Sequence, residues 1–199
     1  MNYFEVFGLP RKLGIDVDAL QARFYDLSRQ HHPDFHQAAP PEEQARALEA
    51  SALVNRAYRT LRDPIARIEY LVRLEEGRDT RDTKDDAVVK PKAPPELLEE
   101  MFEIEEALQA AKMGGLTAEV RQRLEAERNR LAARRDEEEQ RLQDALSRRW
   151  DESSAEARPR IVAEFKESLA TRAYLRTVID DLTNALEPSQ DGHVAHHRH

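Results

Sequence analysis

Hydrophobic residues recur every three or four positions through the first 76 residues, which is the spacing of one face of an α-helix. Proline and glycine interrupt this pattern, and a helix is predicted in each interval. Asp16 or Asp18 can cap the second helix, and Pro33 ends it because the residue before a proline avoids the α region. The four predicted helices cover about 3–7, 16–31, 40–62 and 63–76.

Residues 77–95 interrupt the hydrophobic pattern. A polar stretch of mixed charge is followed by a proline-rich one, which is typical of a linker that is flexible first and stiffer later. Three further helices are predicted over 96–187, with short turns and no strand pattern, and these features indicate a three-helix bundle. The polar stretch 188–199 carries several histidines and is predicted to be a disordered tail. The fold class is therefore all-α.

Composition and charge then exclude several kinds of site. The 199 residues include no Cys and only 6 Gly, which excludes cysteine-ligated metals and disulfides and disfavours glycine-rich nucleotide loops. The net charge is −8, and nearly all of it comes from residues 96–199, so nucleic acid is a poor partner. Without a signal peptide or about 18 consecutive apolar residues, we expect a cytoplasmic protein with no membrane partner.

The most distinctive motif is His32-Pro33-Asp34, which stands between the second and third predicted helices. Pro33 fixes its own φ and restricts His32, so the loop presents both polar neighbours in few conformations. The Asp34 carboxylate can accept two hydrogen bonds from an arginine of a partner. An ordinary helix stop followed by an Asx turn is the alternative interpretation of the tripeptide taken alone.

Three stretches of the chain resemble a J domain, the module that stimulates ATP hydrolysis by DnaK-type chaperones. They are 3–10, 23–34 and 67–71. A J domain followed by a linker and an acidic three-helix bundle resembles the HscB family of iron–sulfur cluster assembly. The resemblance implies a J domain over 1–76 (a helical hairpin with flanking short helices), a linker over 77–95 and a client-binding bundle over 96–187. It implies a co-chaperone that is not an enzyme and needs no cofactor.

One end of such an adaptor would engage a DnaK/HscA-type ATPase chaperone. The resemblance places His32, Pro33 and Asp34 in this contact, with Arg23 and Arg29 adding positive charge from the preceding helix. Positive charge can steer docking onto an acidic surface. These are the only two basic residues between positions 18 and 30, so the electrostatic contribution of this helix to docking is in doubt.

The other end would bind an IscU-like iron–sulfur scaffold protein. The resemblance implies a binding face that includes Leu97, Leu98, Met101, Glu105 and Tyr174. Leu97, Met101 and Glu105 are four residues apart, so they line one helix face. Burial in the bundle core is the alternative for the leucines, Met101 and Tyr174, and a solvated position is the alternative for Glu105.

Three further hypotheses remain beside this one. The first keeps the J domain and gives it a different client protein. The second is a metal-dependent enzyme built on His31, His32 and His36. However, Pro33 breaks any helix between His32 and His36, so their four-residue spacing does not place them on one helix face, and no further residue completes a ligand set. The tail histidines favour a solvated segment. The third is a structural coiled coil, which the prolines of the first half disfavour.

Overall fold

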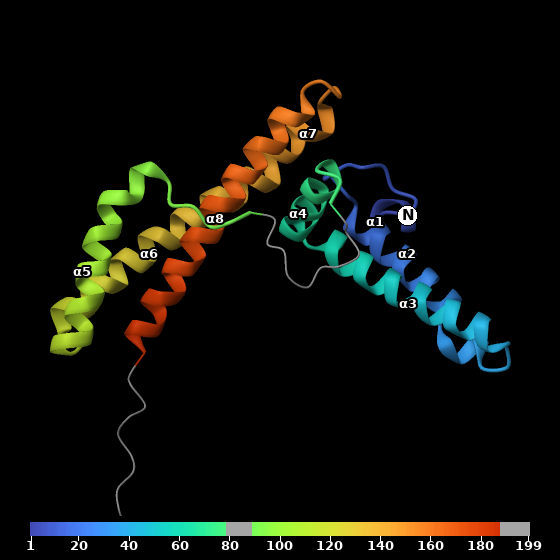
Figure 1. Ribbon diagram of the computed structural model, residues 1–199, viewed down its shortest axis with the longest axis horizontal. Coiled ribbons are helices and arrows are strands. Elements are labelled where there is room, and N and C mark those ends of the chain that lie inside the picture. The colour runs from blue at the N-terminus through green and yellow to red at the C-terminus, as the bar shows by residue number, and fades with distance from the viewer. Residues whose placement is uncertain (79–88, 188–199) are drawn as a thin grey trace, which may run out of the picture. The chain divides into compact units, whose positions relative to one another are not determined.

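The structure is a computed structural model that describes residues 1–78 and 89–187 (Figure 1). These two ranges contain helices and turns and no β-strand, as the sequence predicts. No helix within them combines the length and the hydropathy needed to cross a membrane. The α-helices are α1 (Tyr3–Val6), α2 (Val17–Gln30), α3 (Pro41–Arg62), α4 (Pro64–Glu75), α5 (Leu98–Gly114), α6 (Ala118–Arg141), α7 (Ser147–Glu152) and α8 (Arg158–Leu186). Two 3₁₀ turns, η1 (Pro33–His36) and η2 (Pro95–Leu97), and one π-helical turn, η3 (Leu142–Leu146), complete the described elements.

Side-chain caps set the starts of the helices. The Asp16 carboxylate accepts a hydrogen bond of 3.0 Å from the Ala19 backbone N–H, so Asp16 is the cap of α2. The Asp63 carboxylate accepts one of 2.7 Å from Ala66 and caps α4 in the same way. Thr117 caps α6 through its hydroxyl. Of the two caps predicted for the second helix, Asp16 is confirmed.

The described chain forms two compact units. The first unit comprises Met1–Val89 and Glu139–Leu169, and the second comprises Lys90–Glu138 and the chain from Ala170 onward. The end of the helical region around η3, α7 and the start of α8 therefore packs with the N-terminal helices. The predicted boundaries at 76 and 96 follow the linker composition instead, and they stay a prediction. The predicted tail lies outside the described residues.

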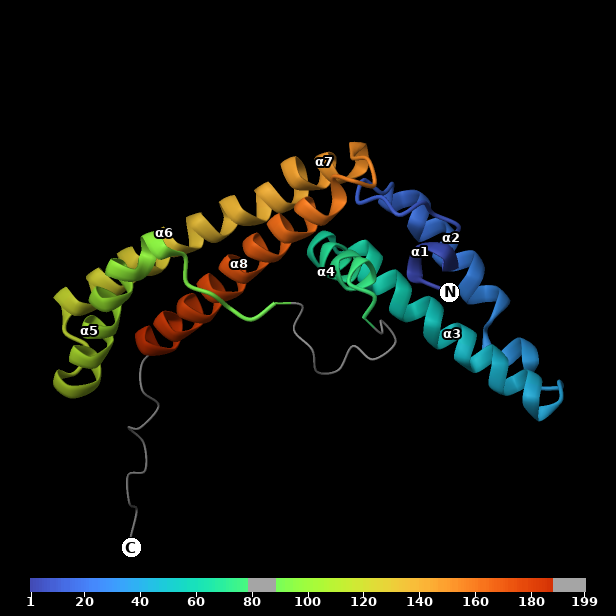
Figure 2. The ribbon, with the colours of Figure 1, turned by 45° about the horizontal axis from the view of Figure 1, so that its top comes forward.

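In the first unit α2 and α3 run antiparallel and side by side, with α1 and α4 beside them (Figure 2). The core of this unit also takes in side chains from the segment around α7. Trp150 and Phe165 have no exposed surface, and each belongs to the same hydrophobic cluster as Phe4 and Leu61. The N-terminal helices are thus completed by residues that lie about 100 positions further along the chain.

Hydrogen bonds hold the α7 segment on the loop before α2. The Asp151 carboxylate accepts bonds of 2.7 Å from the backbone N–H groups of both Leu13 and Gly14. The Trp150 indole N–H donates to the Arg11 carbonyl at 3.3 Å. A side chain at Gly14 would bring its Cβ to 3.0 Å from the Asp151 carboxylate, so glycine permits this close approach.

The second unit is built from α5, the first part of α6 and the second half of α8, which lie side by side in both ribbon views (Figures 1 and 2). A second hydrophobic cluster joins them. Its most buried members are Leu97, Ile104, Leu124, Leu131, Leu175 and Leu182. This packing agrees with the three-helix arrangement expected for the second half of the chain.

Candidate functional site

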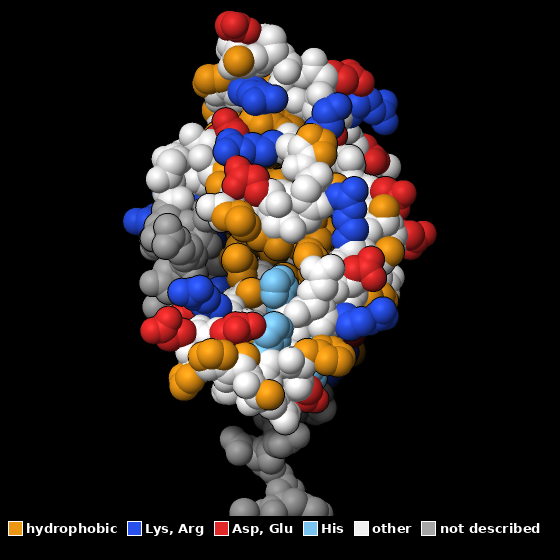
Figure 3. Space-filling view, turned by 90° about the vertical axis from the view of Figure 1, so that its right-hand side faces the viewer, with side chains coloured by type: hydrophobic (Ala, Val, Ile, Leu, Met, Phe, Trp, Pro, Cys, Tyr) orange, Lys and Arg blue, Asp and Glu red, His pale blue; other side chains and the backbone are white. Residues whose placement is uncertain are grey.

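The His32-Pro33-Asp34 motif forms an exposed loop between α2 and α3. Its side chains remain accessible, with 53% of His32 and 70% of Asp34 exposed. His32 Nδ1 lies 3.3 Å from the Asp34 backbone N–H and 3.5 Å from the Asp34 carboxylate, while the ring remains exposed. Figure 3 shows this end of the molecule, where histidine side chains lie beside hydrophobic ones. The loop thus offers one ring donor and one carboxylate to a partner.

His36 contacts the ends of both helices that flank this loop. Its Nε2 lies 3.1 Å from the carbonyl oxygen of Gln30, the last residue of α2, and its Nδ1 lies 3.6 Å from the Glu43 carboxylate in the first turn of α3. The Gln37 amide donates to the Asp34 carboxylate at 3.3 Å. These contacts join both helix ends to the loop, so its conformation is set before any partner binds.

The two arginines of α2 differ in what they contact. Arg23 donates to the backbone carbonyls of Phe7 and Gly8, and its guanidinium therefore caps the end of α1. Arg29 is exposed and has no ion-pair partner among residues 1–78 and 89–187. The docking role predicted for both arginines stays a prediction, but the structure gives Arg23 a contact within its own unit.

Residues of the predicted scaffold face divide between core and surface. Leu97 is 1% exposed and belongs to the second core, whereas Leu98 is 51% exposed. Met101 and Tyr174 are partly buried at the edge of that core, and Glu105 is exposed. Burial raises the pKa of Tyr174, and the negative charge of nearby Glu105 raises it further. The structure therefore brings Glu105 of α5 and Tyr174 of α8 together and removes Leu97 from the surface.

Phe102 is a candidate binding residue that the sequence did not single out. It is 73% exposed and stands four residues after Leu98, so both side chains lie on one side of α5. Leu98, Met101, Phe102 and Glu105 are called the α5 face below. A sequence signal for Phe102 exists: it follows Leu98 by four residues, just as Met101 follows Leu97.

Comparison with known proteins identifies a family domain and two similar structures. Residues 2–70 match the DnaJ domain family. Chaperone HscB from Vibrio cholerae has a similar structure, with a TM-score of 0.59 and 25% sequence identity over 92% of this chain and 96% of that one. The human co-chaperone protein HscB matches with the same TM-score, identity and share of this chain, over 81% of its own length. The chain is an HscB-like J-domain co-chaperone.

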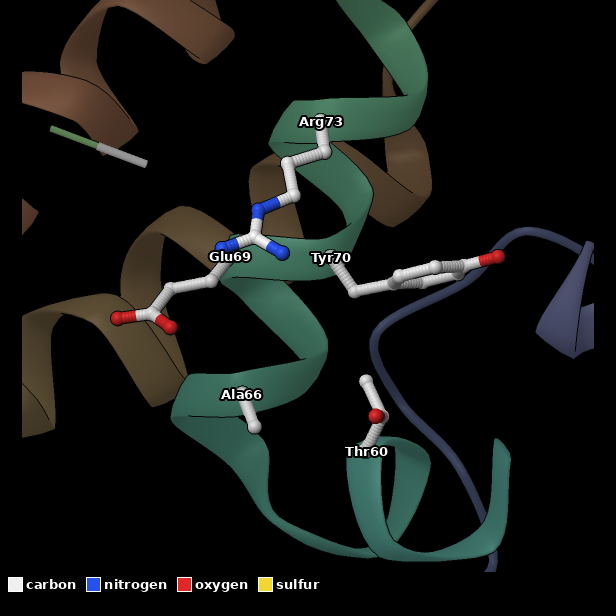
Figure 4. Close-up of a pocket in the computed structure, with 5 residues that line it drawn as sticks. All are labelled: Thr60, Ala66, Glu69, Tyr70 and Arg73. Atoms are coloured by element: carbon white, nitrogen blue, oxygen red, sulfur yellow. The ribbon is translucent and has the colours of Figure 1, made fainter. Parts of the chain in front are cut away.

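The J domain also contains a small hollow at the junction of α3 and α4, with a volume of about 210 Å³ (Figure 4). It is lined by Thr60, Ala66, Glu69, Tyr70 and Arg73. The Tyr70 hydroxyl accepts a hydrogen bond of 2.8 Å from the Tyr3 backbone N–H, and the two rings stack with centroids 4.3 Å apart. This tyrosine therefore ties the start of the J domain to α4.

The histidines of the J domain do not assemble a metal-ligand set in the structure. Within 1–78 and 89–187, no three side chains of His, Asp or Glu converge in a way that could hold an ion. His36 is engaged with Gln30 and Glu43, as described above. The histidines of the predicted tail lie outside the described residues.

Proposed function

We propose that this HscB-like protein stimulates ATP hydrolysis by a DnaK/HscA-type chaperone and delivers an IscU-like iron–sulfur scaffold protein to it. In doing so it would aid cluster transfer and the maturation of iron–sulfur proteins. The observation that carries the proposal is the exposed and braced loop at His32-Pro33-Asp34 in a J domain. The similarity of the chain to the human co-chaperone protein HscB over 92% of its length supports the proposed delivery of a scaffold protein.

The chemistry of the loop suits a partner that carries an arginine. The Asp34 carboxylate is exposed and can accept a bidentate pair of hydrogen bonds, while the His32 ring can donate one. Because the contacts of His36 fix the loop in advance, little conformational entropy is lost on docking. ATP would be bound and hydrolysed by the partner chaperone, and the J domain would favour its hydrolysis-competent state.

The single-turnover rate of ATP hydrolysis by the chaperone tests this role. The wild-type protein should raise the rate, and His32→Gln should abolish the increase because the ring donor and its contact with Asp34 are changed. His31→Gln, at the adjacent histidine, is the matched control and should keep the increase. Stimulation by His32→Gln at the wild-type level would contradict the proposed role of the loop.

The α5 face supports the scaffold-binding half of the proposal. Leu98 and Phe102 expose apolar surface beside the acidic Glu105, on a helix whose opposite side fills the second core. Apolar anchors next to a charged group are a usual composition for a protein-binding surface. The Leu97 side chain lies inside the second core, so its proposed contribution is to support this surface from below.

Binding of a purified IscU-like scaffold, measured by calorimetry, tests this surface. Phe102→Ser and Leu98→Ser should each weaken binding by about tenfold or more, because each removes an anchor that is buried on binding. Met113→Ser is the matched control, since Met113 is 90% exposed at the other end of α5. If the scaffold does not bind while another client binds through Phe102, the protein is a J-domain co-chaperone for that client.

A further inference from the structure

We propose that Arg59 and Arg62 of α3 supply positive charge with which the J domain docks onto an acidic protein surface of its ATPase chaperone. The docking surface would then extend from the His32–Asp34 loop and α2 across to the far half of α3. The inference rests on the proposed function and specifies the residues that provide its electrostatic contribution.

The first step of the argument is the shortage of available positive charge on α2. The Arg23 guanidinium donates to the carbonyls of Phe7 and Gly8 and keeps its charge. The helix carries Arg23 and Arg29 but also the exposed Asp18 and Asp26, so its net charge is zero. An acidic partner surface would find almost no net attraction on α2 alone.

The second step is the exposure of Arg59 and Arg62. Both side chains are exposed, and they stand three residues apart, so they are neighbours on the surface of α3. Among the ion pairs of residues 1–78 and 89–187, none includes either side chain. Two neighbouring cations without an internal counter-charge are available to an external anionic group.

The third step places Arg62 beside α2. The Arg62 guanidinium carbon lies 5.6 Å from the centroid of the Tyr58 ring. That ring in turn stacks on Phe24 of α2, with centroids 4.1 Å apart and ring planes 13° apart. Arg62 is therefore held near the line where α2 and α3 meet, rather than on a separate side of the domain.

The fourth step is the apolar surface that α2 and the same side of α3 expose further along the domain. Leu48 stands 11 and 14 residues before Arg59 and Arg62, about three and four helical turns, so it shares their side of α3. It is 61% exposed, and Tyr25 of α2, whose ring lies 5.7 Å from Phe24, is 57% exposed. Arginine with exposed apolar and aromatic side chains is typical of a protein interface.

The charge of the chain favours a protein as the acidic partner over nucleic acid or an anionic membrane. The whole chain carries a net charge of −8, and the exposed Asp34 and Asp26 lie on the same J domain. A surface dense in phosphates would be repelled by these carboxylates. A protein surface can place its acidic side chains opposite the arginines and its basic ones opposite Asp34.

The test is the concentration of this protein that gives half-maximal stimulation of the chaperone ATPase. The double variant Arg59→Gln/Arg62→Gln should raise it by about tenfold at low salt, with an unchanged maximal rate, because each exposed ion pair contributes up to about fivefold. The difference from wild type should shrink as salt rises from about 50 to 300 mM. Arg46→Gln is the matched control, because Arg46 lies about 140–160° around α3 from the pair.

Two further variants separate the possible outcomes. Arg59→Lys/Arg62→Lys keeps the charge and should keep most of the wild-type affinity, whereas an equal loss in this variant would assign the effect to packing and overturn the proposal. The proposal is also overturned if the glutamine variant behaves like Arg46→Gln. If His32→Gln abolishes stimulation while the glutamine variant does not weaken docking, the proposed function stands and this inference fails. A wild-type protein that gives no stimulation overturns both.

Discussion

At the scale of single residues, Asp151 joins two segments of the first unit that lie far apart in the sequence. Its two carboxylate oxygens accept hydrogen bonds from successive backbone N–H groups, those of Leu13 and Gly14. Arg67 is only 7% exposed nearby, and burial lowers the pKa of its guanidinium while the carboxylates of Asp63 and Asp151 act to raise it. Asp151 therefore accepts the backbone hydrogen bonds of the loop before α2 and also helps compensate the charge of buried Arg67.

Asp151→Asn should destabilise the protein by about 1–3 kcal/mol, because an amide has one acceptor oxygen for two N–H groups and no charge to offset Arg67. The free energy of unfolding from urea titration measures this effect. Glu152→Gln removes a neighbouring exposed carboxylate and should change it by less than about 0.5 kcal/mol. Equal effects of the two substitutions would show that the contacts of Asp151 are not stabilising.

Single residues also show how far the sequence determined the candidate site. The caps at Asp16 and Asp63 were predictable because their partners lie three residues away in the same helix. The resemblance implied a binding face that includes Leu97, but Leu97 is 1% exposed, because four-residue spacing does not tell which side of a helix the core covers. The contact of Arg23 depends on tertiary packing 16 residues away, which local patterns do not record.

At the scale of elements, the helical stretch that starts at Ala118 continues to Glu152 and changes its pitch on the way. The π-helical turn η3 separates α6 from α7, and the Ser147 hydroxyl donates to the Leu142 carbonyl at 2.7 Å inside it. An apolar stripe predicts the length of such a helix but not a local change of its pitch. In the first unit, this turn places Leu142, Leu146 and Trp150 in the core.

An ion-pair cluster joins the end of α4 to α8 in the first unit. Glu76 accepts a hydrogen bond from Lys166 and forms an ion pair with Arg78. Burial acts to raise the pKa of Glu76, but the hydrogen bonds and positive charges of these two partners outweigh it and hold the pKa below its usual 4.5. The ionised carboxylate is therefore favoured in the folded protein.

This cluster predicts a pH dependence of stability. A carboxyl group whose pKa is lowered on folding stabilises the protein above its unfolded-state pKa and loses that contribution as the pH falls through the folded-state value. Glu76→Gln should therefore lower stability near pH 7 and have less effect as the pH falls from about 5 to 3. Urea titrations across this range measure the difference. A difference between wild type and variant that stays constant with pH would contradict the assignment.

At the scale of the whole molecule, the division into compact units does not follow the linker. Composition marks residues 77–95 as a boundary, and the J-domain and bundle boundaries were predicted from it. Packing places Glu139–Leu169 with the N-terminal helices instead. Sequence patterns identify that Trp150 and Phe165 are apolar and helical, but they do not tell which hydrophobic cluster each one joins.

Phe165→Ala is therefore expected to weaken the J domain, although Phe165 lies far beyond it in the sequence. The substitution leaves a cavity in the first core and should cost about 3–5 kcal/mol, seen as faster hydrogen exchange of backbone amides in α3 and α4. Leu182→Ala is the matched control, because Leu182 is equally buried in the second core. It should accelerate exchange in α5 and leave α3 and α4 less affected. If Phe165→Ala left the exchange of α3 and α4 unchanged, the segment around α7 would be packed on the J domain without stabilising it, and residues 1–76 would suffice for the stability of that domain.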